Sequence, residues 1–162
     1  MTTARMRKIC AEQGSTAMAF SALSGLFFVA FVAATILPMQ SEAALAGLIL
    51  TERFSPFTLV AVASVGNTFG SIVNWFLGRE IERFRERSWF PISVKALDRA
   101  SRWYGKYGKW SLLLSWMPLF GDALTVAAGV LREPFLPFTI LVFVAKTGRY
   151  IVLALVTLKI FG

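Results

Sequence analysis

Long uncharged stretches separate the charged residues of this chain. Residues 13–41 and residues 54–78 contain no Asp, Glu, Lys or Arg, and these stretches are 29 and 25 residues long. About 20 consecutive apolar residues are enough to cross the hydrocarbon core of a bilayer. The pattern therefore predicts an all-α integral membrane protein, because a soluble core helix rarely needs so long an uncharged run.

Two interruptions of the apolar sequence share one pattern. A proline breaks each run and a carboxylate follows four residues later, Pro38 with Glu42 and Pro118 with Asp122. Proline removes a backbone donor and disfavours helix in the residue before it. A carboxylate inside a bilayer needs a partner, a proton or water. We interpret each copy as a helix break that places an acid inside the membrane, with chance similarity as the alternative.

The sequence after each break also matches. Pro56-Phe57-Thr58-Leu59-Val60 follows the first break, and Pro137-Phe138-Thr139-Ile140-Leu141 follows the second. Repeats with interrupted helices at corresponding positions indicate a binding site in secondary transporters. We predict one membrane domain over 1–162 with two inverted repeats, each a re-entrant helical hairpin followed by a transmembrane helix. Its parts are a basic N-terminal segment (1–14), the first repeat (15–78), a basic linker (79–109) and the second repeat (110–162).

The linker 79–109 is the most polar part of the chain. It carries four acids and nine basic residues, Arg79, Arg83, Arg85, Arg87, Lys95, Arg99, Arg102, Lys106 and Lys109. The positive-inside rule places such a segment in the cytoplasm, and the part after Pro91 has the pattern of an amphipathic helix on an anionic membrane surface. Nothing in it is suited to reading bases, so we expect no nucleic-acid partner.

The N-terminus raises a conflict over topology. Arg5, Arg7 and Lys8 precede the first apolar run, so the positive-inside rule would place the N-terminus in the cytoplasm beside the linker. Inverted repeats instead require an odd number of crossings between these two segments. We favour the inverted repeats and leave the side of the N-terminus open.

The helix predicted from Pro56 to Gly78 carries small and polar residues on one face. Gly66 and Gly70 form a GxxxG spacing that lets another helix approach closely. Asn67 and Asn74 continue this face, which must contact protein or a water-filled cavity. The stripe either holds the helices together or lines a substrate path.

Lys146 and Arg149 lie three residues apart, about halfway along the last predicted helix. They are too far from its ends to reach the membrane surface easily. Their expected partners are Asp122 and Glu42. Such pairs serve either as a substrate and proton site or as purely structural ion pairs, because a buried pair alone adds little stability.

The composition argues against enzymatic chemistry. The chain has no histidine, and Cys10 is its only cysteine, so histidine bases, histidine–zinc sites and intramolecular disulfides are excluded. No nucleophile with an adjacent base is visible. We predict no catalytic residues, no metal and no cofactor. A membrane enzyme acting on lipid phosphate is the least favoured of the functions considered.

Four groups of motifs follow one another along the chain. They are Leu37-Pro38-x-x-Ser41-Glu42, Gly66-Asn67-Thr68-Phe69-Gly70, Ser115-Trp116-Met117-Pro118 with Gly121-Asp122, and Lys146 with Arg149-Tyr150. Together they resemble the small YqaA branch of the DedA family, which shares the VTT (SNARE-associated) domain. The resemblance covers about residues 21–150.

The resemblance implies a multi-pass protein of the bacterial inner membrane with two facing re-entrant hairpins. Relatives are linked to moving lipids between leaflets, as undecaprenyl phosphate carriers or phospholipid scramblases, and some to the proton-motive force. Two departures stand out. The typical family has an acid shortly before the first proline, where this chain has Ala33, Ala34 and Thr35. The family also has arginines around the second proline, which Lys146 and Arg149 would have to replace.

Two functions therefore compete most closely. One is lipid translocation as a flippase or scramblase, with or without proton coupling, using Glu42, Asp122, Lys146, Arg149, Asn67 and Asn74. The other is a structural or assembly protein without a transported substrate. The expected partners are membrane lipids, either polyprenyl phosphate or phospholipid, and protons. A second copy of the chain is expected as well, since at 162 residues a monomer leaves little room for a cavity.

Overall fold

The structure is a computed structural model that describes residues 3–34, 40–80, 94–118 and 120–161. These residues form helices and turns, with no strand among them. The helices are α1 (Thr3–Ala33), α2 (Gln40–Leu50), α3 (Pro56–Arg79), α5 (Val94–Tyr107), the 3₁₀ helix η1 (Gly108–Trp116), α6 (Phe120–Val130) and α7 (Phe135–Phe161). The prediction of an all-helical protein is confirmed.

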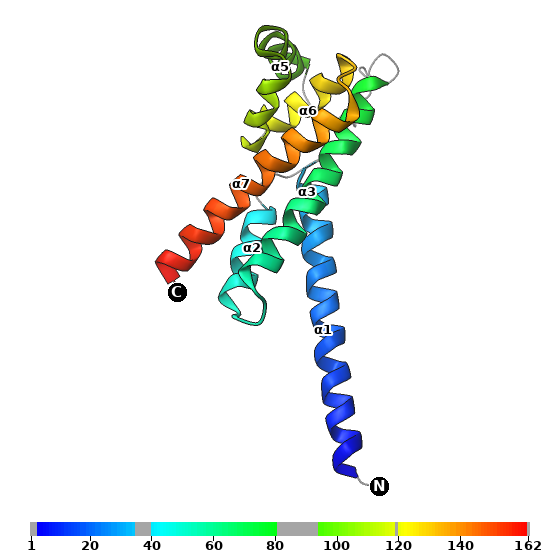
Figure 1. The fold of residues 1–162 in the computed structure, drawn as a ribbon, viewed down its shortest axis with the longest axis vertical. Helices are drawn as coiled ribbons and strands as arrows, with labels where there is room; N and C mark the ends of the chain where they lie inside the picture. The colour runs from blue at the N-terminus through cyan, green and yellow to red at the C-terminus, as the bar shows by residue number, and fades with distance from the viewer. Residues whose placement is uncertain (1–2, 35–39, 81–93, 119, 162) are drawn as a thin grey trace.

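The helices run in alternating directions along the long axis of the molecule (Figure 1). The α1 helix rises from the N-terminus into the upper half of the molecule, α2 returns downward, and α3 rises to the upper end. From α5 at the top, η1 descends, α6 returns upward, and α7 descends to the C-terminus. Each half of the chain is thus a pair of elements followed by one long helix. The two elements of each pair meet near the middle of the helical bundle that lies above the projecting part of α1, a level called mid-height below.

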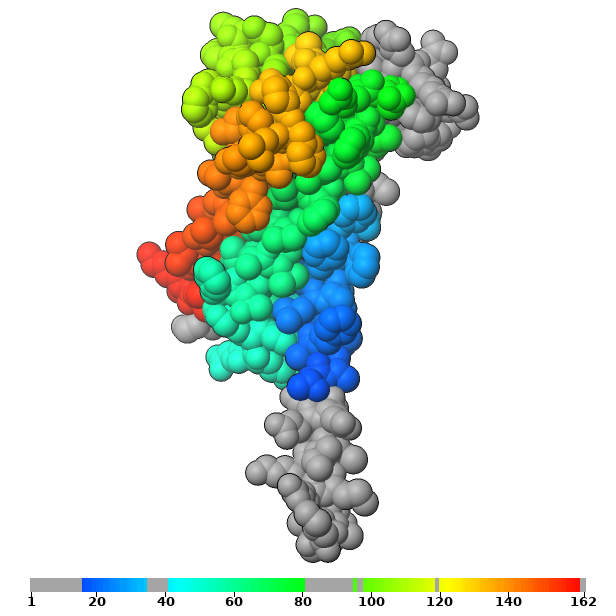
Figure 2. Space-filling model, turned by 45° about the vertical axis from the view of Figure 1, so that its right-hand side comes forward, coloured from blue at the N-terminus to red at the C-terminus, as the bar shows by residue number. Residues whose placement is uncertain are grey.

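The contacts between elements repeat from one half to the other. In the first half α1 packs against α2 and α3, and α2 reaches across to α7. In the second half η1 packs against α6 and α7, and α6 reaches across to α3. The two long helices α3 and α7 also contact each other at the centre. On the face drawn in Figure 2, α3 lies between α1 and α7.

The two turns that precede the long helices are also alike. Glu52 in the α2–α3 turn has φ 54° and Arg132 in the α6–α7 turn has φ 55°. Non-glycine residues seldom adopt this left-handed conformation, so its presence in both turns is a second match between the halves. Pro56 then begins α3 at a position where proline needs no backbone donor.

The break at Pro118 has a local cause. Met117, the residue before the proline, is extended at φ −70° and ψ 131°, because the proline ring disfavours helix in that residue. The chain then restarts, with the Gly121 N–H donating to the Met117 carbonyl at 2.8 Å. Gly121 is required there, since a Cβ at this position would overlap the backbone of Ser115. The first expected break, at Pro38, lies outside the described residues.

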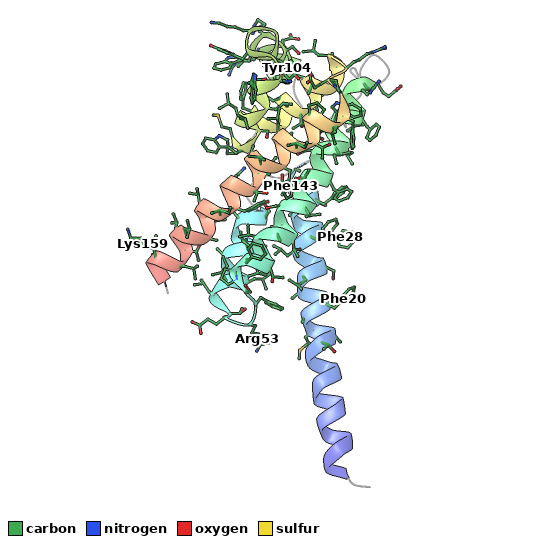
Figure 3. The ribbon with its side chains drawn as sticks, viewed as in Figure 1. Phe20, Phe28, Arg53, Tyr104, Phe143 and Lys159 are labelled. Atoms are coloured by element: carbon green, nitrogen blue, oxygen red, sulfur yellow. The ribbon has the colours of Figure 1, made fainter. Side chains whose placement is uncertain are left out.

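Among the residues that the structure describes, three helices are long and apolar enough to cross a membrane: Thr16–Ala33 within α1, Pro56–Arg79, and Phe135–Ile160 within α7. Exposed apolar side chains cover their outer faces, and Phe20 and Phe28 of α1 point away from the other helices (Figure 3). The α2 and α6 helices have only 11 residues each. That is about 16 Å of helix, roughly half the hydrocarbon thickness.

The N-terminal end of α1 and the helix α5 lie at opposite ends of the long axis (Figure 1). The basic sequences of these two segments therefore cannot both follow the positive-inside rule in one orientation of the molecule. An odd number of membrane crossings between these two segments requires them to lie at opposite ends, as they do here.

The glycines of the GxxxG spacing lie where α3 contacts α1. A Cβ on Gly66 would overlap the carbonyl oxygen of Phe27, and a Cβ on Gly70 would overlap that of Phe31. Gly78 of α3 and Gly129 of α6 meet equally closely at the upper end of the molecule. Small residues thus set the helix spacing at both contacts, as is common in membranes.

We expect Gly66→Ala to destabilise the protein by about 1–3 kcal/mol, because the added methyl group overpacks the α1–α3 contact. Gly47→Ala is the matched control, since open space surrounds Gly47 within α2. It should stabilise the helix by about 0.5–1 kcal/mol. Thermal unfolding of the detergent-purified variants, followed by circular dichroism, measures both changes. Equal unfolding temperatures for the two variants would contradict the close contact.

Candidate functional site

The centre of the molecule contains charged residues from both halves of the chain. Lys146, Arg149 and Tyr150 lie near the middle of α7, and the acids reach them from α2 and α6. All four charged side chains are mostly shielded from solvent. The four charged residues that the sequence analysis singles out therefore meet beside the middle of α7.

Lys146 and Asp122 form the more deeply buried ion pair. The Lys146 Nζ lies 3.0 Å from the Asp122 Oδ1, and the lysine side chain is 3% exposed. Removing charges from water requires several kcal/mol per ion, and a close partner returns most of that free energy. This pair therefore explains how α7 carries a lysine inside the molecule.

Arg149 connects the two halves of the chain. Its Nε donates to the Glu42 Oε1 at 2.6 Å, and its second amino nitrogen contacts the same oxygen. Its remaining amino group donates to the Trp116 carbonyl at 2.9 Å. The Glu42 side chain is 28% exposed, so this pair is more accessible than the pair of Lys146 and Asp122.

Both acids occupy the same place in their helices. Glu42 is the third residue of α2 and Asp122 the third residue of α6, so each lies in the first turn. The N-terminus of a helix carries a partial positive charge that favours acids. A helix that begins at mid-height of the molecule therefore places an acid there and also stabilises it.

A hydrogen-bond chain adjoins the Glu42–Arg149 pair. The Asn67 Nδ2 donates to the Tyr150 hydroxyl at 2.8 Å, and the Tyr150 hydroxyl donates to the Ser41 Oγ at 3.0 Å. All three residues are buried. This series of hydrogen bonds joins α3, α7 and α2, so it fixes the start of α2 against both long helices.

Asn74 satisfies the backbone at the end of α1. Its Nδ2 donates to the Ala34 carbonyl at 2.8 Å, as Arg149 does for the Trp116 carbonyl. Irregular backbone at membrane depth is tolerated only where protein or water satisfies it. A polar side chain from a long helix therefore caps the carbonyl end of each broken element.

The sequence-predicted site residues are not all in one place. Glu42, Asp122, Lys146 and Arg149 come together, and Asn67 joins them through Tyr150. Asn74 lies apart and bonds to the end of α1. Sequence reasoning missed Ser41 and Tyr150 as members of the network, although each directly neighbours a predicted charged residue in the chain. Within the described ranges, no cluster of metal-ligating side chains occurs.

These features define a class of protein: a polytopic helical membrane protein with ion pairs in its interior. The comparisons give the family, because the profile of the VTT domain matches residues 14–158. The chain belongs to the VTT-domain (DedA) family, as its motifs indicate, and is a protein of the bacterial inner membrane.

Curated relatives agree with this assignment. The chain is 34% identical over 139 residues to the inner membrane protein YqaA of Escherichia coli, covering 85% of this chain and 92% of that protein. It is 29% identical over 121 residues to the undecaprenyl phosphate transporter A of Staphylococcus aureus, covering 69% of this chain and 60% of the transporter. For the Bacillus subtilis protein of that name, the identity is 28% over 68% of this chain and 58% of the relative. No solved structure matches the chain.

The buried pair makes a prediction about stability. Asp122→Leu leaves the Lys146 charge without a partner and should destabilise the protein by about 3–5 kcal/mol. Adding Lys146→Met removes that unpaired charge, so the double variant should be more stable than the single one. Chemical denaturation in detergent measures both free energies of unfolding. If the second substitution lowers the stability further, the two side chains are not coupled as the structure has them.

Proposed function

We propose that this protein moves an anionic lipid between the leaflets of the inner membrane, as a flippase or scramblase. One observation carries the proposal: acids from corresponding positions in the two halves pair with cations one turn apart on α7. Structural ion pairs alone are a weak reason to keep four charges inside a membrane protein. Intramembrane ionisable residues more often mark the path of a substrate or a proton.

The arrangement of the helices supports the proposal. We take residues 1–162 as one domain in which α1–α2 and η1–α6 form two re-entrant hairpins of inverted repeats. The half-length helices α2 and α6 begin at mid-height and return toward opposite ends (Figure 1). Transporters built this way hold their substrate near the bilayer midplane, where broken helices meet.

The names of two relatives support an anionic lipid as the substrate. Two of them are named undecaprenyl phosphate transporters, and a polyprenyl phosphate or a phospholipid offers an anionic phosphate to a cation. The family's arginines around the second proline are missing here. However, the Arg149 guanidinium bonds to the Trp116 carbonyl, two residues before Pro118. We infer that Arg149 supplies from α7 the cation that relatives place in the second break.

The more accessible pair offers a mechanism of exchange. Protonation of Glu42 removes its negative charge and frees the guanidinium of Arg149, which can then bind a lipid phosphate in a bidentate manner. When the proton leaves, the carboxylate competes for Arg149 and releases the phosphate. The Arg149 guanidinium is paired with one anion in both states, either the Glu42 carboxylate or the lipid phosphate. One proton therefore binds to Glu42 or leaves it in each exchange. Asp122 keeps Lys146 neutralised meanwhile, and Asn67 holds Tyr150 beside the site.

A non-transporting structural or assembly role is the second candidate. The observation that favours it is that every charge at the site already has a partner, so the pairs by themselves explain why the charges are tolerated. In that case the glycine contacts and the network would hold the bundle together. We propose a homodimer for both candidate functions, and neither function includes a catalysed covalent reaction.

Lipid movement in liposomes separates the two candidates. The protein is reconstituted with a fluorescent anionic lipid, and a membrane-impermeant reductant then bleaches the outer leaflet. Translocation leads to bleaching beyond the outer-leaflet fraction. A pH difference across the membrane tests the proton dependence.

We expect Glu42→Gln to slow lipid movement about tenfold, which corresponds to about 1.4 kcal/mol of activation free energy. Glutamine cannot take up and release a proton, so Arg149 retains an anionic head without the competing carboxylate. Glu52→Gln is the control, because Glu52 lies exposed in the α2–α3 turn. Wild-type rates for Glu42→Gln would exclude the exchange mechanism, and no movement with the wild-type protein would favour the structural role.

A further inference from the structure

An open apolar groove runs between α3 and α7. Its volume is about 360 Å³, and its lining includes Phe57, Val60 and Ala61 of α3 with Ile151, Leu155 and Leu158 of α7. The two helices diverge toward the end where α3 begins and α7 finishes (Figure 1). Phe143 marks the other end of the groove, near the middle of the molecule (Figure 3).

Two hydroxyl groups in this apolar wall have no partner. The Ser64 and Thr147 hydroxyls both belong to residues that line the groove, and neither has a hydrogen-bond partner among the described residues. Ser64 is fully buried. A buried hydroxyl without a partner is unfavourable, so a ligand atom that accepts a hydrogen bond there would be favoured.

The hydroxyls lie beside the polar centre. Ser64 precedes Asn67 by three residues and Thr147 precedes Tyr150 by three, which is about one helical turn in each case. The hydrogen bond between Asn67 and Tyr150 joins the two helices at this level. Because α3 and α7 run in opposite directions, the two hydroxyls flank that bond along the groove. The end of the groove near these hydroxyls therefore lies at the level of the Asn67–Tyr150 bond, whereas Arg149, two residues after Thr147, lies on the opposite face of α7.

The corresponding place in the other half of the molecule is filled. With Pro56 aligned to Pro137, an offset of 81 residues, Phe57 corresponds to Phe138. Phe57 is 82% exposed, whereas Phe138 is fully buried and stacks on Trp75 with ring centroids 5.9 Å apart. Ser64 likewise corresponds to Ala145, which has no hydroxyl. Of these two equivalent surfaces, only the one beside Phe57 is left open.

We propose that this groove binds one hydrocarbon chain of the transported lipid, with the polar end of that chain at the level of the Ser64 and Thr147 hydroxyls. The role of this site in transport rests on the proposed function, whereas the binding itself can be measured separately. From Thr147 to Leu158 the helix rises about 16 Å, close to half of the hydrocarbon core. A lipid whose head is held at mid-height therefore extends its chain through the groove into one leaflet. The groove is thus the path for a lipid caught between the leaflets.

Photocrosslinking tests the binding. A benzophenone amino acid is placed at Ala61 in the groove or at Val156, which is exposed on the opposite face of α7. The protein is extracted from vesicles of phosphatidylglycerol and phosphatidylethanolamine, washed in detergent and irradiated. Intact mass should show a lipid adduct at position 61 that is about tenfold more abundant than at position 156, equivalent to a tenfold difference in affinity. A crosslink between two copies, or equal adducts at both positions, would overturn the proposal.

Two substitutions test the two parts of the site. Ala61→Trp should fill the groove and reduce both retained lipid and lipid movement about tenfold, whereas Val156→Trp, on the opposite face of α7, should change neither. Ser64→Ala combined with Thr147→Val should lower lipid retention without lowering the unfolding temperature, because the lost hydroxyls have no protein partner. Unchanged retention in this double variant would overturn the role of the hydroxyls.

The two proposals fail separately. If the wild-type protein moves lipid but retains none at position 61, and Ala61→Trp moves it as fast, the groove is excluded while the translocation function stands. If lipid is retained in the groove but the wild-type protein moves none, the binding site stands and translocation is excluded.

Discussion

The pairing of two α7 cations with two acids is the interaction on which the rest of the structure depends. A charge inside a bilayer protein is tolerated only with a close partner. Here each partner comes from the first turn of a half-length helix, where the helix N-terminus also favours an acid. Helices that begin at mid-height require breaks in the chain, and the broken backbone requires donors. Arg149 and Asn74 supply donors at the two breaks, so charge and backbone are satisfied together.

The two ion pairs differ in what they permit. The Lys146 side chain is almost fully enclosed, so its separation from Asp122 would leave a charge without either partner or water. Glu42 is partly exposed and shares its cation with a backbone carbonyl. Arg149 therefore loses less when Glu42 leaves it than Lys146 would lose without Asp122. In the proposed mechanism, this difference makes the Glu42–Arg149 pair the better place for exchange with a phosphate and leaves the deeper pair as a fixed support.

Much of this arrangement could be predicted from the sequence because the signals were local. Uncharged runs indicate membrane helices, and a proline followed by an acid indicates a break with a carboxylate beyond it. The sequence also predicted that Asp122 and Glu42 pair with the α7 cations, because few other charges lie in apolar sequence. The sequence could not predict which acid meets which cation, because that depends on how α2 and α6 cross α7. The role of Asn74 at the end of α1 was missed for the same reason: its helical face predicts a polar stripe but not the carbonyl that it meets.

The difference between the two halves matters as much as their likeness. A symmetric pair of repeats would offer a lipid chain the same surface toward both leaflets. In this protein one surface between α3 and α7 is closed by the stacking of Trp75 on Phe138, and the other is open beside Ser64. An open groove on one side lowers the free energy of a chain that points into that leaflet only. In the proposed lipid transport, the unequal apolar surfaces therefore favour one orientation of the bound tail, whereas the direction of net movement is set by the lipid and proton gradients.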